Sequence, residues 1–530
     1  MSWYDPVFRM ITAVRALVRA RPSLVIWASI AVGVVVFSYI FTLMLAVACA
    51  YLPLVLLSSM SSISYQVVLL SIAGIIVAVT IIWSVLPRRD RFRPPGPILS
   101  PDTQPRLFSE IEQIAAAFEE PVPGGVYLTA ELNAWVARRG GFMGVGSRRV
   151  MGIGLPLMQV LTISQFRAVL AHEFGHYYEG DTRLGPWIFS ARAAMARTLE
   201  NLGGNSSLVE TVSRFQGARL VLVIVMAVLN AYWKLFIRIT QFVSRKQEFR
   251  ADELACAVAG PEPMIAGLKT LAESAPALRE YWFTEVVPSL EAGYRPPFAE
   301  GFGQFLSAPH VAAAAKENLT KVLAEEATAV DDTHPPLRDR IAAIDALTLV
   351  AKPEICEGAT TLLEDLDGLE VKVISQVAPE LDAKRLKPLG WADAGREAYV
   401  PIWRKMTSEH GQFLDSLTIC ALPETLNRIP ELSATLRDPP GRLFTREQRA
   451  QRAANVLWMA LALALVDHGW QVRSEPGRFC LFSGDQEVNP ITKFGELQSG
   501  EMSAAGWREW AEGLDISQIP LNSKLAAGAA

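Results

Sequence analysis

Residues 172–176 of the chain read His-Glu-Phe-Gly-His, with two histidines four positions apart and a glutamate directly after the first. On an α-helix, positions i and i+4 lie on the same face, so both imidazoles can reach one metal ion. Glu173 then lies beside the open coordination position of that metal, where it can polarise a water molecule. Because the chain has only six histidines, a chance occurrence on an ordinary helix is the weaker interpretation. The motif predicts the zinc site of a hydrolase, with His172 and His176 as ligands.

The flanking sequence predicts the helix that this motif needs. Thr162 and Gln165 have the spacing of a capping box, in which two side chains satisfy backbone N–H groups at the start of a helix. Apolar residues then recur at helical spacing and predict a stripe that faces the core: Phe166, Val169, Leu170 and Phe174.

Two short strands are predicted upstream, over residues 125–129 and 148–154, with a glycine-containing loop over 138–146 between them. The second strand comes just before the metal helix. It is either an edge strand on which an extended peptide substrate pairs, or an ordinary interior strand of a small sheet. The sequence leaves both interpretations open.

A second helix is predicted over residues 244–260. Ser244 and Gln247 have capping-box spacing at its start, and Gly260 followed by proline indicates its end. This segment lies downstream of the histidine motif, where a third ligand is needed to complete the metal site.

Glu248 and Asp252 lie four positions apart on one face of this second helix. Like charges at that spacing destabilise a helix unless a cation neutralises them. Zinc would do so, with Glu248 as the third ligand and Asp252 accepting a hydrogen bond that orients a histidine. A solvated face neutralised by nearby arginines explains the pair equally well. Asp181 is a weaker candidate for orienting a histidine and is more typical of a helix end.

Two long uncharged segments near the N-terminus predict a transmembrane helical hairpin, with helices over about residues 24–50 and 66–86. Arginines flank both outer ends of the hairpin, and the connecting loop carries no charge. The positive-inside rule therefore places both termini, and everything after the hairpin, in the cytoplasm. The five scattered cysteines, with no C-x-x-C pair, suit a reducing compartment. The net charge of −4 argues against a nucleic-acid partner.

One further apolar segment, residues 220–233, is about a dozen residues long and too short to span a bilayer. Residues 186–202, just before it, carry too much charge to span. We therefore expect a buried or membrane-adjacent helix here, with a hairpin that dips into the membrane as the alternative.

Three motifs together resemble the integral-membrane gluzincin metalloprotease family, which includes HtpX-like proteases and the CAAX prenyl endoprotease. They are HEFGH at 172–176, RKQEFRAD at 245–252 and THPPLRDRI at 333–341. The segment LTAELNAWV at 128–136 resembles the family's sequence upstream of the metal helix. The resemblance covers about residues 105–347, with the motifs in the family's order.

This resemblance implies one zinc ion per chain, bound by His172, His176 and Glu248, with Glu173 as the general base. It also implies that His334 lies at the active site and that Arg340 supports the substrate or the transition state. Two family features are not found in this sequence: a second pair of membrane helices between the motifs, and a chamber of several membrane helices around the site. An open cytoplasmic site therefore fits better than one specific for prenylated peptides.

Four segments are predicted along the chain, and together they give a predominantly α-helical α+β protein. They are a membrane anchor over 1–93, a Pro-rich linker over 94–106, a zincin-like zinc metalloprotease domain over 107–350, and a small α+β accessory domain over 351–530.

Within the accessory domain, an apolar run over residues 453–466 predicts a core helix, and alternating residues over 470–482 predict a β-hairpin. Residues 501–514 predict a terminal helix packed through Trp507 and Trp510.

The predicted function is a membrane-anchored zinc-dependent endopeptidase that hydrolyses peptide bonds of membrane-associated or unfolded proteins. One alternative is a zinc aminopeptidase, which needs an acidic anchor for the substrate's amino terminus, and no such motif stands out. The other is a non-proteolytic membrane scaffold or chaperone-like binding protein, although a structural zinc site has no use for Glu173. The expected partners are a protein or peptide substrate and the lipid bilayer, with no nucleic acid, and a homo-oligomer is compatible with the sequence. The expected location is the bacterial inner membrane, with the catalytic domain facing the cytoplasm.

Overall fold

The protein is described here from a computed structural model of residues 1–530. The structure describes residues 24–59, 65–86, 88–142, 145–178, 181–203, 216–324, 334–382, 385–435 and 444–522. The arginines that precede the first membrane helix lie outside these ranges. Over the described residues the protein is mostly helical with four sheets, which confirms the predicted α+β class.

Two compact units divide the chain, and neither is one continuous segment. Unit 1 contains Met1–Ala272 and Asn318–Asp365, and unit 2 contains Glu273–Glu317 and Leu366–Ala530. Residues 273–317, which fall within the predicted protease domain, thus cluster with the C-terminal segment. The chain passes from one unit to the other three times: within α10 (Pro261–Tyr281), within α13 (Pro309–Ala324), and between Asp365 and Leu366.

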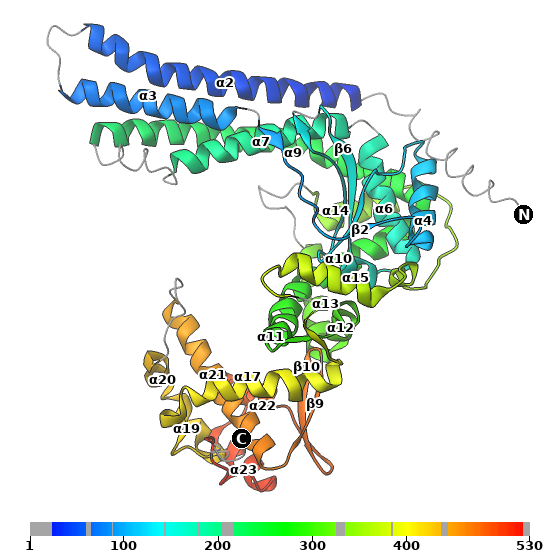
Figure 1. Ribbon diagram of the computed structural model, residues 1–530, viewed down its shortest axis with the longest axis vertical. Helices are drawn as coiled ribbons and strands as arrows, with labels where there is room; N and C mark the ends of the chain where they lie inside the picture. The colour runs from blue at the N-terminus through cyan, green and yellow to red at the C-terminus, as the bar shows by residue number, and fades with distance from the viewer. Residues whose placement is uncertain are drawn as a thin grey trace, which may run out of the picture. The chain divides into compact units, whose positions relative to one another are not determined.

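Four long helices of unit 1 pack together as a bundle (Figure 1). They are α2 (Leu24–Ser59), α3 (Tyr65–Val85), α7 (Asp181–Leu202) and α9 (Gln216–Ala259). Their contacts are apolar and include Ala46, Ile81 and Leu229, all without solvent exposure. In contrast, large apolar side chains such as Met44 and Val79 point outward, as expected of a membrane-facing surface.

Three helices among the described residues are long and apolar enough to cross a membrane. The qualifying segments are Gly33–Ser59, Val67–Val85 and Val221–Ala259. The first two agree with the predicted hairpin. The third begins at the apolar segment that the sequence analysis considered too short to span.

The expectation of a short apolar helix followed by a separate helix from residue 244 is wrong, because α9 is one continuous helix of 44 residues. Ser244 and Gln247 lie inside it, so their capping-box spacing marks no helix start. The predicted end is confirmed, since α9 stops at Ala259 and Gly260 adopts a left-handed φ of 99°. Together, α7 and α9 form a second pair of helices that packs against α2 and α3. Of this pair, only α9 qualifies as a candidate span among the described residues.

Unit 1 also contains a four-stranded sheet with the order β2-β3-β6-β4. Its strands are β2 (Ile98–Leu99), β3 (Val126–Thr129), β4 (Ala134–Arg139) and β6 (Arg148–Gly154). β3 and β6 confirm the two predicted strands and pair in parallel. β6 also pairs antiparallel with β4, so the strand before the metal helix is interior and the edge interpretation of it is wrong. The edge strands are β2 and β4, and part of β4 was predicted as loop.

Short elements complete unit 1. A two-stranded sheet joins β1 (Arg89–Asp90), which follows α3, to β5 (Gly141–Phe142), which follows β4. The remaining elements are α4 (Pro105–Ala117), α5 (Leu155–Val160), α6 (Ile163–Tyr178), α14 (Leu337–Asp345) and the 3₁₀ turn η2 (Ala359–Leu362). The predicted linker thus contributes β2 to the sheet.

Unit 2 has an aromatic centre around Tyr281, whose ring lies 5.5 Å from those of Phe302 and Phe305 and 5.9 Å from that of Trp391. Its helices are α11 (Val287–Glu291), α12 (Phe298–Ser307), α15 (Leu366–Val377), α16 (Trp391–Ala394), α17 (Val400–Ser408), α18 (Gly411–Leu414), α19 (Leu422–Leu426), α20 (Ile429–Thr435), α21 (Arg446–Asp467), α22 (Pro490–Ser499) and α23 (Ala504–Gly513). Short π and 3₁₀ turns lie at η1 (Trp282–Val286), η3 (Gly395–Tyr399) and η4 (Ile419–Ala421).

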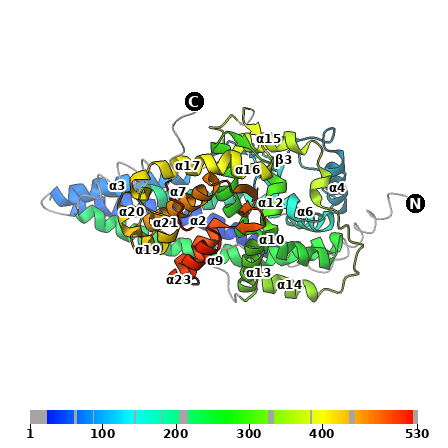
Figure 2. The ribbon, with the colours of Figure 1, turned by 90° about the horizontal axis from the view of Figure 1, so that it is seen from below.

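The strands of unit 2 form β7 (Tyr294–Arg295) with β8 (Lys387–Pro388), and the meander β9 (Gln471–Glu475), β10 (Arg478–Ser483) and β11 (Gln486–Val488). β9 and β10 confirm the predicted hairpin, and α21 confirms the predicted core helix, which packs against α17 (Figure 2). The terminal helix is α23, with Trp507 fully buried against the ring of Trp510.

Candidate metal centre

Helix α6 carries the histidine motif and is fixed at both its start and its buried face. Thr162 Oγ1 accepts from Gln165 N, and the side chain of Gln165 accepts from Thr162 N, which confirms the capping box. Phe166 and Phe174 have no solvent exposure, as the predicted stripe requires. Arg167 forms an ion pair with Glu110 of α4, which joins the two helices. The capping box, the buried face and the ion pair therefore fix the position of α6 independently of any metal ion.

Three side chains converge from two helices: His172 and His176 from α6, and Glu248 from α9. The two Nε2 atoms lie 3.2 Å apart. Oε2 of Glu248 lies 3.5 Å from Nε2 of His172, and Oε1 lies 3.5 Å from Nε2 of His176. The structure thus brings all three predicted ligands to one point, even though more than seventy positions separate His172 from Glu248.

These distances suit a tetrahedral zinc ion. Bonds of about 2.0–2.1 Å in that geometry place the ligand atoms about 3.3 Å from one another. Glu248 Oε2 is buried and makes no aligned hydrogen bond within the described residues, although three nitrogens surround it. A buried carboxylate oxygen in that state costs free energy unless a cation neutralises it. Two imidazoles and one carboxylate are also a donor set that zinc accepts in catalytic sites.

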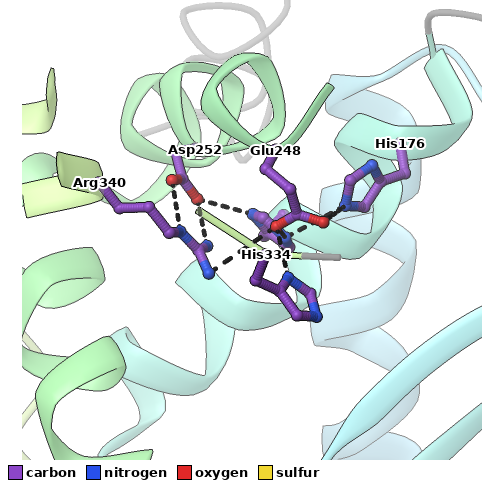
Figure 3. A network of polar contacts seen from close by, with 6 residues as sticks. His176, Glu248, Asp252, His334 and Arg340 are labelled. Atoms are coloured by element: carbon purple, nitrogen blue, oxygen red, sulfur yellow. Dashed lines mark hydrogen bonds and ion pairs between the residues drawn. The ribbon is translucent and has the colours of Figure 1, made fainter. Parts of the chain in front are cut away.

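Behind the ligands, a buried ion pair orients the first histidine (Figure 3). Arg340, on α14, donates to both carboxylate oxygens of Asp252, from Nε at 2.8 Å and from NH2 at 2.6 Å. Oδ1 of Asp252 lies 2.9 Å from Nδ1 of His172, on the ring edge opposite the metal position. Such a carboxylate fixes the ring's orientation and leaves Nε2 as the ligand atom. Arg340 lies in this buried network, with no exposed guanidinium to meet a substrate directly.

Two further residues complete the mouth of the site. His334 is exposed over 56% of its side chain, and its Nδ1 lies 2.9 Å from Oε2 of Glu248. Glu173 follows the first histidine on α6 and is half-buried. Asp181 begins α7, and its side chain lies outside the described residues.

The electrostatics of the site favour positive charge at the convergence point. Burial acts to lower the pKa of His172, but the neighbouring carboxylates of Asp252 and Glu248 raise it to about 9. Burial raises the pKa of Glu173 above its ordinary value, which brings this carboxylate closer to the range in which it exchanges protons near neutral pH.

Sequence reasoning missed one element that holds the site together. Residues 352–359 of unit 1 contact α6 and α9, the two helices that carry the candidate ligands. Nζ of Lys352 donates to Val258 O at 2.7 Å and also to Ala257 O, which satisfies carbonyls at the end of α9. Ile355 N donates to Ser164 Oγ at 2.7 Å, at the start of α6. A lysine beside a helix C-terminus has no distinct local signature, so only the fold reveals this role.

Gly175 allows α6 and α9 to approach each other closely. We expect Gly175→Val to weaken both zinc binding and folding. A Cβ at this position would lie 3.1 Å from Cα of Ala251, three positions after Glu248. The helices must separate, at a cost of about 1–3 kcal/mol, and Glu248 moves with α9. Zinc affinity and the thermal midpoint of the purified protein measure the effect.

The matched control is Gly267→Ala on α10, where the new Cβ meets Gln165 Cβ at an ordinary 3.6 Å. Removing a helical glycine there should stabilise the protein by about 0.5–1 kcal/mol. Equal behaviour of the two variants would contradict the close-approach argument.

Comparisons with known proteins agree with this geometry. Residues 101–348 match the model of peptidase family M48. Protease HtpX of Idiomarina loihiensis is 28% identical over 172 residues, which are 31% of this chain and 56% of the relative. Protease HtpX of Pseudomonas fluorescens is 26% identical over 178 residues, which are 32% of this chain and 58% of the relative. The chain thus spans a little over half the length of these relatives. No solved structure matches it.

Proposed function

Because residues 101–348 match the model of peptidase family M48, we propose that the chain is a membrane-anchored zinc-dependent endopeptidase. Its substrates in this proposal are membrane-associated or unfolded proteins, and each chain binds one zinc ion. The observation that carries the proposal is the convergence of His172, His176 and Glu248 beside Glu173. A purely structural metal site gains nothing from a carboxylate at that position.

When bound, zinc would polarise the scissile carbonyl and lower the pKa of a water molecule toward about 7. Glu173 accepts the proton of the attacking water and later delivers it to the leaving amine, so one carboxylate serves as base and then as acid. His334 donates from its exposed edge to the developing oxyanion. Arg340 acts through Asp252, which holds His172 in its ligating orientation, and so has a positioning role. Asp181 has no assigned contact in this scheme.

The sheet supplies a surface for an extended peptide. β4 is an edge strand, and it packs directly against α6, the helix that carries the two histidines. A substrate strand that pairs with β4 would gain main-chain hydrogen bonds with little dependence on its side chains. This mode suits unfolded segments, which expose their backbone.

A site close to a bilayer is supported by α9, which both qualifies as a candidate span and carries Glu248. In our proposal the protein is integral to the bacterial inner membrane, with its termini and catalytic domain in the cytoplasm. The segments 1–93, 94–106, 107–350 and 351–530 serve as anchor, linker, protease domain and accessory domain. A homo-oligomer is compatible with this arrangement.

The experiment is digestion of an N-terminally acetylated, unstructured protein by the purified full-length chain in detergent, with fragments identified by mass spectrometry. We expect internal cleavage that 1,10-phenanthroline abolishes and added zinc restores. Release of single residues, only from substrates with a free amino terminus, would instead indicate an aminopeptidase. Binding of the substrate without any fragment would indicate a scaffold or chaperone-like protein.

A further inference from the structure

The connection between β4 and β6 has exposed apolar side chains at its turn. Phe142 and Val145 face each other across the turn through two backbone hydrogen bonds, of 3.0 and 2.9 Å. Their side chains are 50% and 79% exposed. We call Phe142 and Val145 the apolar tip. Two large apolar groups held next to each other in water are unfavourable unless something covers them.

The apolar tip is tied to the end of a membrane helix. Phe142 pairs with Arg89 in the small sheet of β1 and β5, and Arg89 comes four positions after the last residue of α3, Val85. Four residues span at most about 14 Å, and paired strands lie about 5 Å apart. The tip therefore lies within about 20 Å of the end of the span. Trp83, 65% exposed near that end, is a residue type typical of the membrane–water interface.

Arginines surround the tip on both strands and on β1. Residues 88–93 and 138–149 contain eight arginines and one acidic residue, Asp90. Asp90 accepts from Arg139 at 2.9 and 3.1 Å and from Gly140 N at 2.7 Å, which fixes β1 to the turn. Arg149 pairs with Glu120 at 2.8 Å. The other six arginines are exposed: Arg88, Arg89, Arg91, Arg93, Arg138 and Arg148.

We propose that this arginine-flanked turn is a second membrane contact, in which the apolar tip enters the headgroup region and the arginines bind anionic lipid headgroups. The combination of exposed apolar side chains, a cationic surround and a place close to the end of α3 matches an interfacial anchor. β4, the edge strand of the catalytic sheet, leads directly into this turn. The contact would therefore hold that edge at a fixed height above the bilayer. The proposal goes beyond the proteolytic function and does not depend on it.

The test uses the full chain in lipid nanodiscs, with an environment-sensitive NBD dye on Val145→Cys. Cys356→Ser and Cys420→Ser remove the two native cysteines that are not buried. Val350→Cys is the matched control, since Val350 belongs to the same unit and is 86% exposed. Nanodiscs of phosphatidylcholine, with or without phosphatidylglycerol, contain a lipid that carries a spin label at the headgroup.

We expect blue-shifted emission at position 145 and several-fold stronger quenching by the spin-labelled lipid than at position 350. Quenching should increase with phosphatidylglycerol, and Arg138→Gln with Arg148→Gln should remove that increase. Equal, weak quenching at both positions would overturn the proposal. Strong quenching at 145 that ignores phosphatidylglycerol would overturn its electrostatic part and leave a purely apolar contact.

Discussion

Glu173→Gln should lose peptide-bond cleavage, with kcat lower by about 10²–10⁴-fold or more, while zinc stays bound. The amide keeps the shape of the side chain but cannot accept a proton from the attacking water. The ligands His172, His176 and Glu248 are unchanged, so zinc content should remain near that of the wild type. Metal analysis and initial rates on the same preparation measure both quantities.

The matched control is Glu112→Gln on α4, where an exposed glutamate undergoes the same chemical change. Its rate and zinc content should equal those of the wild type. Zinc loss in Glu173→Gln would show that Glu173 is a ligand. An unchanged rate would remove it from the mechanism.

The second large effect is expected from Arg340→Met. This change leaves the carboxylate of Asp252 buried without its bidentate partner. Removing one member of a buried ion pair costs about 3–5 kcal/mol, so the thermal midpoint of the chelator-treated protein should fall by about 10 °C. Zinc affinity should also fall, since Asp252 is no longer held against His172.

Arg338→Met, two positions earlier on α14, is the control because Arg338 is exposed and pairs only loosely with Asp339 at 3.5 Å. It should change stability by less than about 0.5 kcal/mol. Combining Arg340→Met with Asp252→Asn should restore much of the midpoint, because no buried charge is left alone. Zinc affinity should still stay about 10–100-fold lower. Recovery of both properties would rule out an orienting role for Asp252.

The histidine pair and the start of its helix could be predicted because each depends on residues that are close together in the sequence. The spacing of His172 and His176, and the capping box at Thr162, depend only on neighbouring residues of one helix. Glu248 and Asp252 raised the question of a cation because they repel each other on one helix face. The three ligands then meet at one point in the structure.

The rest depends on tertiary contacts that one sequence does not display. Ser244 and Gln247 have capping spacing, but α9, which packs against α2, α3, α6 and α7, continues through them. Near the end of β4 the arginines and glycines favoured a loop in the sequence. Residues up to Arg139 are a strand because they pair with β6. The implied role of Arg340, support of the substrate or the transition state, stays a prediction, because a motif gives no direction for a side chain. The structure turns it toward Asp252.

The most direct test of the zinc site is the zinc content per chain of the wild type and of Glu248→Gln, after gel filtration in the presence of a mild chelator. Our account predicts about one zinc per chain in the wild type, the number that a single three-ligand site holds, and loss of most of it in the variant. Two results would contradict it. One is a wild-type protein that binds no zinc when zinc is supplied. The other is a variant that retains zinc as firmly as the wild type, which would place the metal away from His172, His176 and Glu248.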